Sequence, residues 1–476
     1  MIAGRFVNRA LAASLLAAGL MLASCSPGGA SPSVILVTVD TLRADHVGLS
    51  GGAPQPTPAM DRVGLEGAWA PRAVAPFGRT TQSVGTILTG LHPLHHGADG
   101  LGMVLPDTVT TLAEAFSAAG YRTGAFVSNV NLRSGLGFEQ GYEIFSNSRA
   151  RWKGDSAPAL TGEALAWLDS LPASKPFFLW VHYLDPHWPY TPPGDFLRRT
   201  DPDGTGAPDI FRRVAEGELT KGQVIFFADQ VMDAGQIELT RRAYQAEVVE
   251  TDRALGALLD GLEQRKLLDS SILMLTADHG EAMGDHRYWF AHGEYLYDDT
   301  LRVPWAVRAP GIVPAGTRLE GLVLLEDVAP TLAHLAGIDF PAPCDGLDLA
   351  PLLGRGGVQQ VEPRSQIHLT DHHLVHPENP RRPVPGRPGR WWALRRGPWK
   401  VIEIPLGDGE RSFELYDLQR DPTEAHDLAA EEHERLREMV EQLERLRRQL
   451  GPGPQGEAVE GSAEELEALR GLGYMN

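Results

Sequence analysis

The stretch Val34-Ile35-Leu36-Val37-Thr38-Val39-Asp40 is a continuous apolar run, rich in β-branched residues, that ends on a carboxylate. A strand buried on both faces of a parallel sheet has this composition. A second run of this kind, residues 271–276, leads directly into Ala277-Asp278-His279-Gly280. Both stretches therefore predict buried strands, each followed at once by side chains that can carry chemistry.

Helix-like and strand-like segments alternate along most of the chain. Helical spacing is present at residues 110–119, 162–171 and 239–262, and strand-like runs occupy residues 123–127 and 177–183. Such alternation predicts an α/β fold around a mostly parallel sheet. In these sheets the functional groups gather at the carboxyl ends of the strands. Asp40, Asp185 and Asp278 each lie at or just past such an end.

The chain changes character after about residue 340. Residues 380–390 are rich in Pro, Gly and Arg and predict a loop, followed by short strands at 391–395, 399–404 and 413–418 and a helix at 429–450. We therefore expect a catalytic domain over residues 34–340 and a smaller C-terminal α+β subdomain over residues 341–450. Residues 451–476 are expected to form a loop and a short terminal helix.

The N-terminus has the pattern of a targeting segment. Arg5 and Arg9 precede an apolar run at residues 10–23, and Leu22-Ala23-Ser24-Cys25 follows. This ending is typical of a bacterial lipoprotein signal peptide over residues 1–24, with Cys25 as the lipidated residue; the alternative is an ordinary secretory signal. Residues 25–33 would then be a flexible tether. We expect an exported lipoprotein of the bacterial cell envelope, periplasmic or surface-facing and held to a membrane by its lipid anchor.

The formal net charge of −19 argues against a protein that binds nucleic acid through bulk charge, so no nucleic-acid partner is expected. Cys344 is the only cysteine besides Cys25, which predicts a mature chain without an intrachain disulfide.

Four residues form a candidate metal site: Asp40, Thr80, Asp278 and His279. Two carboxylates, an imidazole and a hydroxyl favour Zn²⁺ or Mn²⁺ and suit Ca²⁺ or Mg²⁺ less well. A bound metal would lower the pKa of the Thr80 hydroxyl and make it a nucleophile. Taken singly, an aspartate at a strand end is more often a turn or cap residue, and a threonine before a helix is more often an N-cap.

Three ordered segments resemble the sulfatase family of the alkaline phosphatase superfamily. They are Val37-Thr-Val-Asp-Thr-Leu-Arg-Ala-Asp-His46, Arg79-Thr-Thr-Gln-Ser-Val-Gly-Thr-Ile-Leu-Thr-Gly90 and Thr276-Ala-Asp-His-Gly-Glu281. His182-Tyr-Leu-Asp-Pro-His-Trp-Pro-Tyr190 and further matches extend the resemblance over residues 33 to about 430. It implies an alkaline-phosphatase-like sandwich in which Asp40, Thr80, Asp278 and His279 share one metal.

The chain departs from the family pattern at the nucleophile. Thr80 occupies the place of the cysteine that sulfatases oxidise to formylglycine, and threonine cannot be converted in this way. The Pro and Arg of the Cys-x-Pro-x-Arg motif are replaced by Gln82 and Val84, and the second of the paired aspartates by Thr41. Asn129 lies in the stretch that carries the family's substrate-binding lysine; it could contact the substrate or serve only a turn.

Two histidines are implied to face the same pocket. His187 and His292 could bind a substrate oxygen, protonate the leaving group, or hold a second metal together with Asp185; the alternative for each is a hydrogen-bonded structural histidine. A histidine suits the acid role because its pKa is near neutral. Residues 193–235 are expected to cap the pocket.

The leading expectation is a metal-dependent hydrolase of phosphate mono- or diesters, or a phosphoryl transferase, with Thr80 as nucleophile. The alternatives are a sulfuric ester hydrolase that uses the same site and a non-catalytic surface binding protein on the same fold. The substrate would be a small-molecule, glycan or lipid-headgroup ester.

Overall fold

The computed structural model describes residues 31–52, 56–147, 156–194, 208–341, 343–370, 378–381, 389–451, 456–459 and 461–471. The chain divides into residues 1–31 and 32–476, and only the second unit is considered from here on. The predicted signal peptide and Cys25 lie outside the described residues, and so do residues 195–207 of the predicted cap. Within the described ranges no helix has the length and apolar character needed to cross a membrane.

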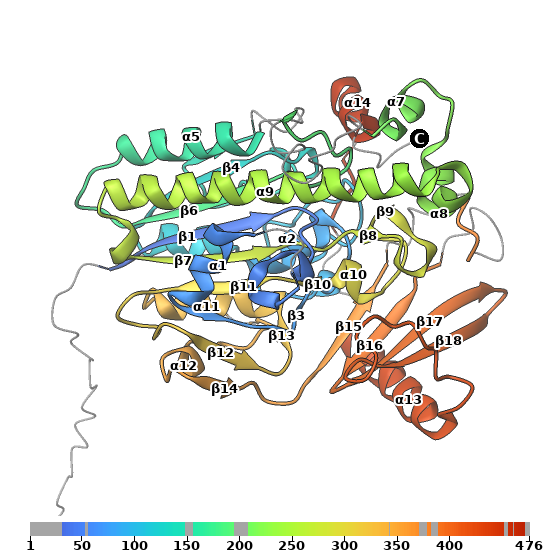
Figure 1. The fold of residues 1–476 in the computed structure, drawn as a ribbon. Coiled ribbons are helices and arrows are strands. Elements are labelled where there is room, and N and C mark those ends of the chain that lie inside the picture. Colours follow the sequence, from blue (N-terminus) through green and yellow to red (C-terminus); the bar gives the residue numbers. More distant parts are fainter. Residues whose placement is uncertain are drawn as a thin grey trace, which may run out of the picture. The chain divides into compact units, whose positions relative to one another are not determined.

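The core of the fold is a nine-stranded sheet in the order β14-β12-β2-β11-β7-β1-β6-β4-β5 (Figure 1). Only the pairings of β11 are antiparallel, which confirms the predicted mostly parallel α/β sheet. The strands are β1 (Ser33–Val39), β2 (Ala68–Trp69), β4 (Arg122–Val127), β5 (Ile144–Ser146), β6 (Phe177–Tyr183), β7 (Ser271–Ala277), β11 (Trp305–Arg308), β12 (Thr317–Glu320) and β14 (Val358–Gln360).

Helices cover both faces of this sheet. On one face α1 (Pro58–Leu65), α5 (Ser156–Asp169) and the 31-residue α9 (Ala234–Gln264) pack on one another. On the other face lie α2 (Thr80–Thr89), α4 (Leu112–Ala118) and α11 (Val328–Leu335). Gly261 lets α9 approach α5, because a Cβ there would lie 2.6 Å from Leu165. The result is the expected α/β sandwich.

The sequence predicted the long elements and several strands of five residues or more well, whereas it indicated few of the shortest helices and two-residue strands. Helix α4 begins after a capping box formed by Thr111 and Glu114, close to its predicted start. Strand β14 adds to the edge of the central sheet, so that sheet takes one strand from beyond residue 340, the predicted end of the catalytic domain. The short elements are α3 (Pro93–His96), α7 (Ile210–Ala215), α8 (Lys221–Val231), α10 (Asp298–Leu301), α12 (Ala350–Leu353), β3 (Ala73–Val74), β8 (Ala282–Met283), β9 (Trp289–Ala291), β10 (Arg302–Val303) and β13 (Val323–Leu324).

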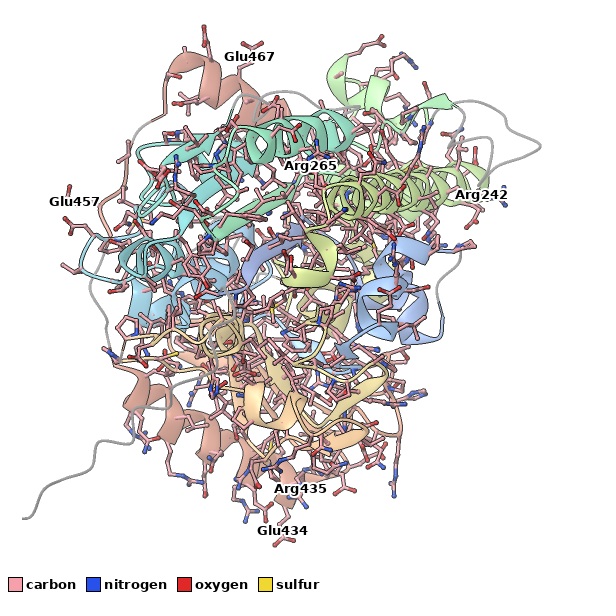
Figure 2. All side chains as sticks on the ribbon, turned by 90° about the vertical axis from the view of Figure 1, so that its left-hand side faces the viewer. Arg242, Arg265, Glu434, Arg435, Glu457 and Glu467 are labelled. Carbon is pink, nitrogen blue, oxygen red and sulfur yellow. The ribbon has the colours of Figure 1, made fainter. Side chains whose placement is uncertain are left out.

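A separate four-stranded antiparallel sheet forms the expected C-terminal α+β part. It consists of β15 (Ser365–Leu369), β16 (Trp392–Arg396), β17 (Trp399–Gly407) and β18 (Glu410–Asp417), with α13 (His433–Leu450) packed on it. The terminal helix is α14 (Ala463–Gly471). In Figure 2 the labelled side chains of Glu434, Arg435, Glu457 and Glu467 lie at the outer edge of the view.

Candidate active site

The candidate site lies where three adjacent central strands end. Strand β1 is paired with β7 on one side and β6 on the other, and Thr38 is in register with both Thr276 and His182. Asp40 and Asp278 therefore leave neighbouring strands at the same level, and the end of β6 brings His182 beside them. Ligand atoms of Asp40, His182 and Asp278 all lie within 4.8 Å of one another, and all three residues are fully buried.

Four buried atoms at this point have no hydrogen-bond partner among the described residues: Asp40 Oδ1, Asp278 Oδ2, His182 Nε2 and His279 Nε2. Buried polar groups in folded proteins are almost always paired, and each orphan costs about 1–3 kcal/mol. Four orphans at one point, two of them on carboxylates, are what a divalent cation would satisfy. The residues therefore fit a metal.

The tautomer of His279 strengthens this conclusion. Its Nδ1 lies 2.9 Å from the carbonyl oxygen of Gly280, which can only accept, so Nδ1 carries the proton. In the neutral ring the Nε2 lone pair then faces Asp278 Oδ2 at 3.5 Å and Asp40 Oδ1 at 3.9 Å. Three electron-rich atoms at these distances repel one another unless a cation lies between them. A backbone acceptor behind a ring nitrogen is also the usual support of a metal-ligating histidine.

His182 is a site residue that the sequence reasoning missed. Its Nδ1 lies 2.8 Å from the hydroxyl of Thr38, which also accepts a hydrogen bond from the indole of Trp180 at 2.9 Å. Its Nε2 lies 3.5 Å from Asp40 Oδ2. The sequence did show that His182 stands inside the predicted strand at residues 177–183. In the structure all seven residues of this strand are buried. Its use became visible only when β6 was placed next to β1.

Thr80 is the first residue of α2 and is 1% exposed. Its hydroxyl lies 3.5 Å from Asp40 Oδ2 and 3.4 Å from Asn129 Nδ2. Asn129 also donates to Asp40 Oδ2, and its own Oδ1 accepts from the backbone of Asn131 at 2.7 Å. Asn129 therefore shapes a turn, and its amide lies beside the nucleophile candidate; its contact with a substrate stays a prediction. The start of a helix favours an anion in general, because its first backbone N–H groups have no partner within the helix.

The two carboxylates titrate far apart in the protein without a metal. Burial alone would raise the pKa of Asp40, but His187, His182 and His279 outweigh it and bring that pKa to about 2. Burial and the neighbouring charge of Asp40 raise the pKa of Asp278 to about 6. Asp40 is thus the stronger anion, and a cation at the site would compete with a proton on Asp278.

The two predicted pocket histidines lie together beside His279. The ring centroids of His279 and His292 are 4.3 Å apart, and those of His187 and His292 are 5.1 Å apart. His187 Nδ1 lies 2.6 Å from its neighbour's carbonyl, and His292 Nδ1 lies 3.1 Å from Glu281 Oε1. Burial lowers the pKa of His292 well below its usual value, so this ring is neutral near pH 7.

The predicted second-metal group receives no support. Among the described residues Asp185, His187 and His292 do not form a set of ligand atoms within 4.8 Å of one another. Asp185 instead accepts a hydrogen bond from the Ser156 hydroxyl of α5. Its position two residues beyond β6 takes it toward α5 and α9, where Thr251 donates to its carbonyl.

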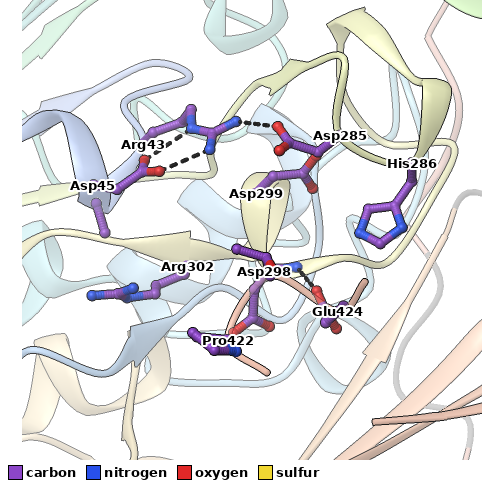
Figure 3. A pocket seen from close by; sticks show the side chains of 11 residues that line it. Arg43, Asp45, Asp285, His286, Asp298, Asp299, Arg302, Pro422 and Glu424 are labelled. Atoms are coloured by element: carbon purple, nitrogen blue, oxygen red, sulfur yellow. Dashed lines mark hydrogen bonds and ion pairs between the residues drawn. The ribbon is translucent and has the colours of Figure 1, made fainter. Parts of the chain in front are cut away.

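A charged pocket of about 240 Å³ lies next to the loop that carries the site (Figure 3). Arg43 pairs with Asp45 at 2.8 Å and with Asp285 at 2.9 Å. The same guanidinium donates to the carbonyl of Glu281 at 3.1 Å. Arg43 therefore holds the loop in which Glu281 contacts His292.

The same pocket joins the catalytic domain to the C-terminal sheet. Asp298 of α10 pairs with Arg395 at 2.7 Å and with Lys400 at 2.8 Å, and Lys400 also pairs with Glu424 at 2.7 Å. Lys400 is fully buried. These acidic groups are neutralised by protein cations, so they fix the two sheets to each other and are not a cation site.

Comparisons with known proteins identify the family of this chain. The sulfatase family model matches residues 32–338, and a model of the C-terminal region of N-sulphoglucosamine sulphohydrolase matches residues 284–449. An arylsulfatase of Clostridium perfringens is 25% identical over 68% of this chain and 78% of its own. An N-acetylglucosamine-6-O-sulfatase of Bacteroides thetaiotaomicron is 23% identical over 91% of this chain and 90% of its own.

Among solved structures, a phosphonate monoester hydrolase of Agrobacterium radiobacter is similar in fold. It is 21% identical, with a TM-score of 0.71, and the match covers 88% of this chain and 96% of that one. Family members are ester hydrolases that act on sulfate or phosphonate esters and use a divalent metal. Because the family model spans more than half of the sequence and the site residues converge on one metal position, this chain belongs to the sulfatase family.

Proposed function

We propose that this sulfatase-family enzyme hydrolyses phosphate mono- or diesters, with Thr80 as the nucleophile. The observation that carries the proposal is the Thr80 hydroxyl, which lies 3.5 Å from Asp40 beside the four orphaned ligand atoms. A threonine cannot supply the formylglycine diol on which sulfate esters are usually cleaved. A phosphoryl group accepts an alkoxide nucleophile directly.

We propose that Asp40, His182, Asp278 and His279 hold the metal, with Thr80 completing the set. Two imidazoles and two carboxylates favour Zn²⁺ or Mn²⁺ over Ca²⁺ or Mg²⁺, whose sites are built from oxygen. When bound, the metal would supply positive charge that lowers the pKa of the nucleophile and neutralises the phosphoryl oxygens.

In the first step Thr80 Oγ attacks phosphorus and the bond from phosphorus to the substrate's alcohol oxygen breaks. The departing alkoxide takes a proton from His187 in its protonated form, and Asp40 receives the proton that Thr80 loses. In the second step water attacks the phosphothreonine and the P–Oγ bond breaks; Asp40 returns its proton to Thr80 Oγ, and the proton lost by the water passes through His292 to His187. His292 suits the role of base in this step, because its Nδ1 proton is held by Glu281 and Nε2 carries the lone pair. An acceptor alcohol in place of water would make the protein a transferase.

A sulfuric ester hydrolase is the second candidate, and the names of most relatives favour it. The non-catalytic alternative is less favoured, because Asp40, Thr80, Asp278 and His279 are all present. The substrate class proposed is a small-molecule, glycan or lipid-headgroup ester, and the exported, lipid-anchored location is proposed from the N-terminal sequence alone.

The test is parallel kinetics on an aryl phosphate, an aryl phosphodiester and an aryl sulfate that share one phenol, each with Zn²⁺, Mn²⁺, Ca²⁺ or Mg²⁺. The proposal requires a phosphate-type ester to have the highest kcat/KM. Faster turnover of the sulfate ester would instead establish the second candidate.

A further inference from the structure

Arg79, the residue before the proposed nucleophile, is a buried cation that has only one distant ion-pair partner in the part of the protein that the structure describes. It is 9% exposed, and its side chain makes no hydrogen bond to any described residue. One ion pair is present, with Glu294, at a distance of 3.9 Å. Glu294 is already engaged by the amide of Asn379 at 2.9 Å. A guanidinium carries five N–H donors, and leaving them unpaired inside a protein is costly.

The neighbouring backbone is shaped to admit this side chain. Gly293 has φ +84, and a Cβ there would lie 2.5 Å from Arg79 Nε. Only glycine at this position leaves room for the guanidinium, which therefore lies directly beside His292. The backbone thus accommodates a buried guanidinium that finds no hydrogen-bond acceptor in the described ranges of the protein. This arrangement indicates that an external ligand supplies the acceptor.

Lys221 brings a second positive charge to the same place. It is the first residue of α8, in the segment predicted to cap the pocket, and its Nζ lies 5.8 Å from the centre of the Trp188 ring. A lysine in the first turn of a helix opposes the helix dipole, so local helix stability does not explain it. Trp188 directly follows His187, whose ring centroid lies 5.1 Å from that of His292. Arg79 contacts Gly293, the residue after His292. Both cations therefore lie on the side of the site formed by His187 and His292.

These contacts set the order of groups across the pocket. Thr80 and the orphaned ligand atoms form one end. The rings of His279 and His292 follow, with their centroids 4.3 Å apart. Arg79 lies against Gly293, next to His292, and Lys221 lies over the ring of Trp188, next to His187. In the proposed reaction the phosphoryl group is held at the first end, and the leaving alcohol extends past the histidine that serves it. The alcohol portion of the substrate therefore reaches the two cations.

We infer that Arg79, with Lys221 as a second charge, binds an anionic group on the alcohol portion of the substrate. The preferred esters thus carry a second oxyanion, such as a carboxylate, sulfate or phosphate, near the ester that is cleaved. The orientation of the substrate in this inference rests on the proposed function. The claim that an anion binds here rests on Arg79 itself. Arginine is the residue suited to it, because its planar fork binds an oxyanion with two hydrogen bonds.

The test uses two aryl esters with the same scissile group, one with a carboxylate on the phenol ring and the other with the neutral carboxamide. For the wild-type enzyme kcat/KM should favour the carboxylate by about tenfold or more, the range of a charge-assisted hydrogen bond. Arg79→Gln should bring this ratio close to one and Lys221→Gln should reduce it in part. Arg72→Gln, which changes an exposed arginine a few residues away, should leave the ratio unchanged.

A ratio near one in the wild type, or an equal loss on both esters in Arg79→Gln, would overturn the inference and make Arg79 a structural residue. Arg79→Lys keeps the charge and guards against a folding defect, and it should retain part of the preference. Calorimetry with the free carboxylated phenol and its amide, neither of them an ester, gives an independent readout. Selective binding of the carboxylated phenol that Arg79→Gln abolishes supports the anion site even if no phosphate ester is cleaved, whereas phosphate turnover without such binding refutes the site and leaves the proposed function intact.

Discussion

Asp278→Asn should have opposite effects on the metal-free and the metal-bound protein. The folded pKa of Asp278, about 6, lies above the usual 3.8, so the folded state prefers the protonated form. The free-energy cost of burying the ionised carboxylate therefore destabilises the folded state as pH rises from about 4 to about 6, and it persists above that range. The shift of roughly two units corresponds to about 3 kcal/mol for this fully buried group.

In the presence of a chelator, Asp278→Asn should raise the melting temperature at pH 8 and leave it nearly unchanged at pH 4. With Zn²⁺ or Mn²⁺ the wild type should gain stability through binding, and the variant should gain far less because an amide is a poor ligand. The assay is thermal unfolding with and without metal at both pH values, with metal content measured in parallel. Asp260→Asn, an exposed change in α9, is the control. A variant that is destabilised without metal, or that binds metal as tightly as wild type, would refute the reasoning.

Three further outcomes are expected. His182→Gln should lower metal affinity by at least the 10–100-fold typical of a supporting residue, and unchanged affinity by titration calorimetry would remove it from the site. Burial raises the pKa of Glu326 to about 7, so unfolding free energy measured in urea should fall from pH 4.5 to pH 7 more steeply in wild type than in Glu326→Gln; identical slopes would contradict this. Cys25→Ser should abolish membrane partitioning in fractionated cells, and wild-type protein without lipid at residue 25 would disprove the anchor.

The sequence was sufficient to predict those elements whose character depends only on their own residues. The apolar run before Asp40 and the run before Asp278 predicted both the buried strands and the polar groups at their ends. Helix α9 was also predictable, because the long amphipathic spacing at residues 239–262 is typical of a helix; the observed helix of 31 residues extends beyond it at both ends.

The residues that the sequence did not reveal depend on contacts between distant segments. His182 became a site residue only through the pairing of β6 with β1, 144 residues apart at Thr38 and His182. The position of the Arg79 guanidinium depends on Gly293, and the hydrogen bond between Asp185 and Ser156 depends on how the chain beyond β6 meets α5. The spacing of residues along the chain does not predict these contacts, because they join segments that are far apart in the sequence.

The central claim is that Thr80 is the covalent nucleophile, and trapping the intermediate tests it most directly. The enzyme would be quenched in acid during steady-state turnover of an aryl phosphate ester and analysed by peptide mass spectrometry. The account predicts one added phosphoryl group on Thr80, absent in Thr80→Ala together with most of the activity and present in Thr80→Ser at a reduced rate. A phosphoryl group on another residue, or full turnover by Thr80→Ala, would contradict it.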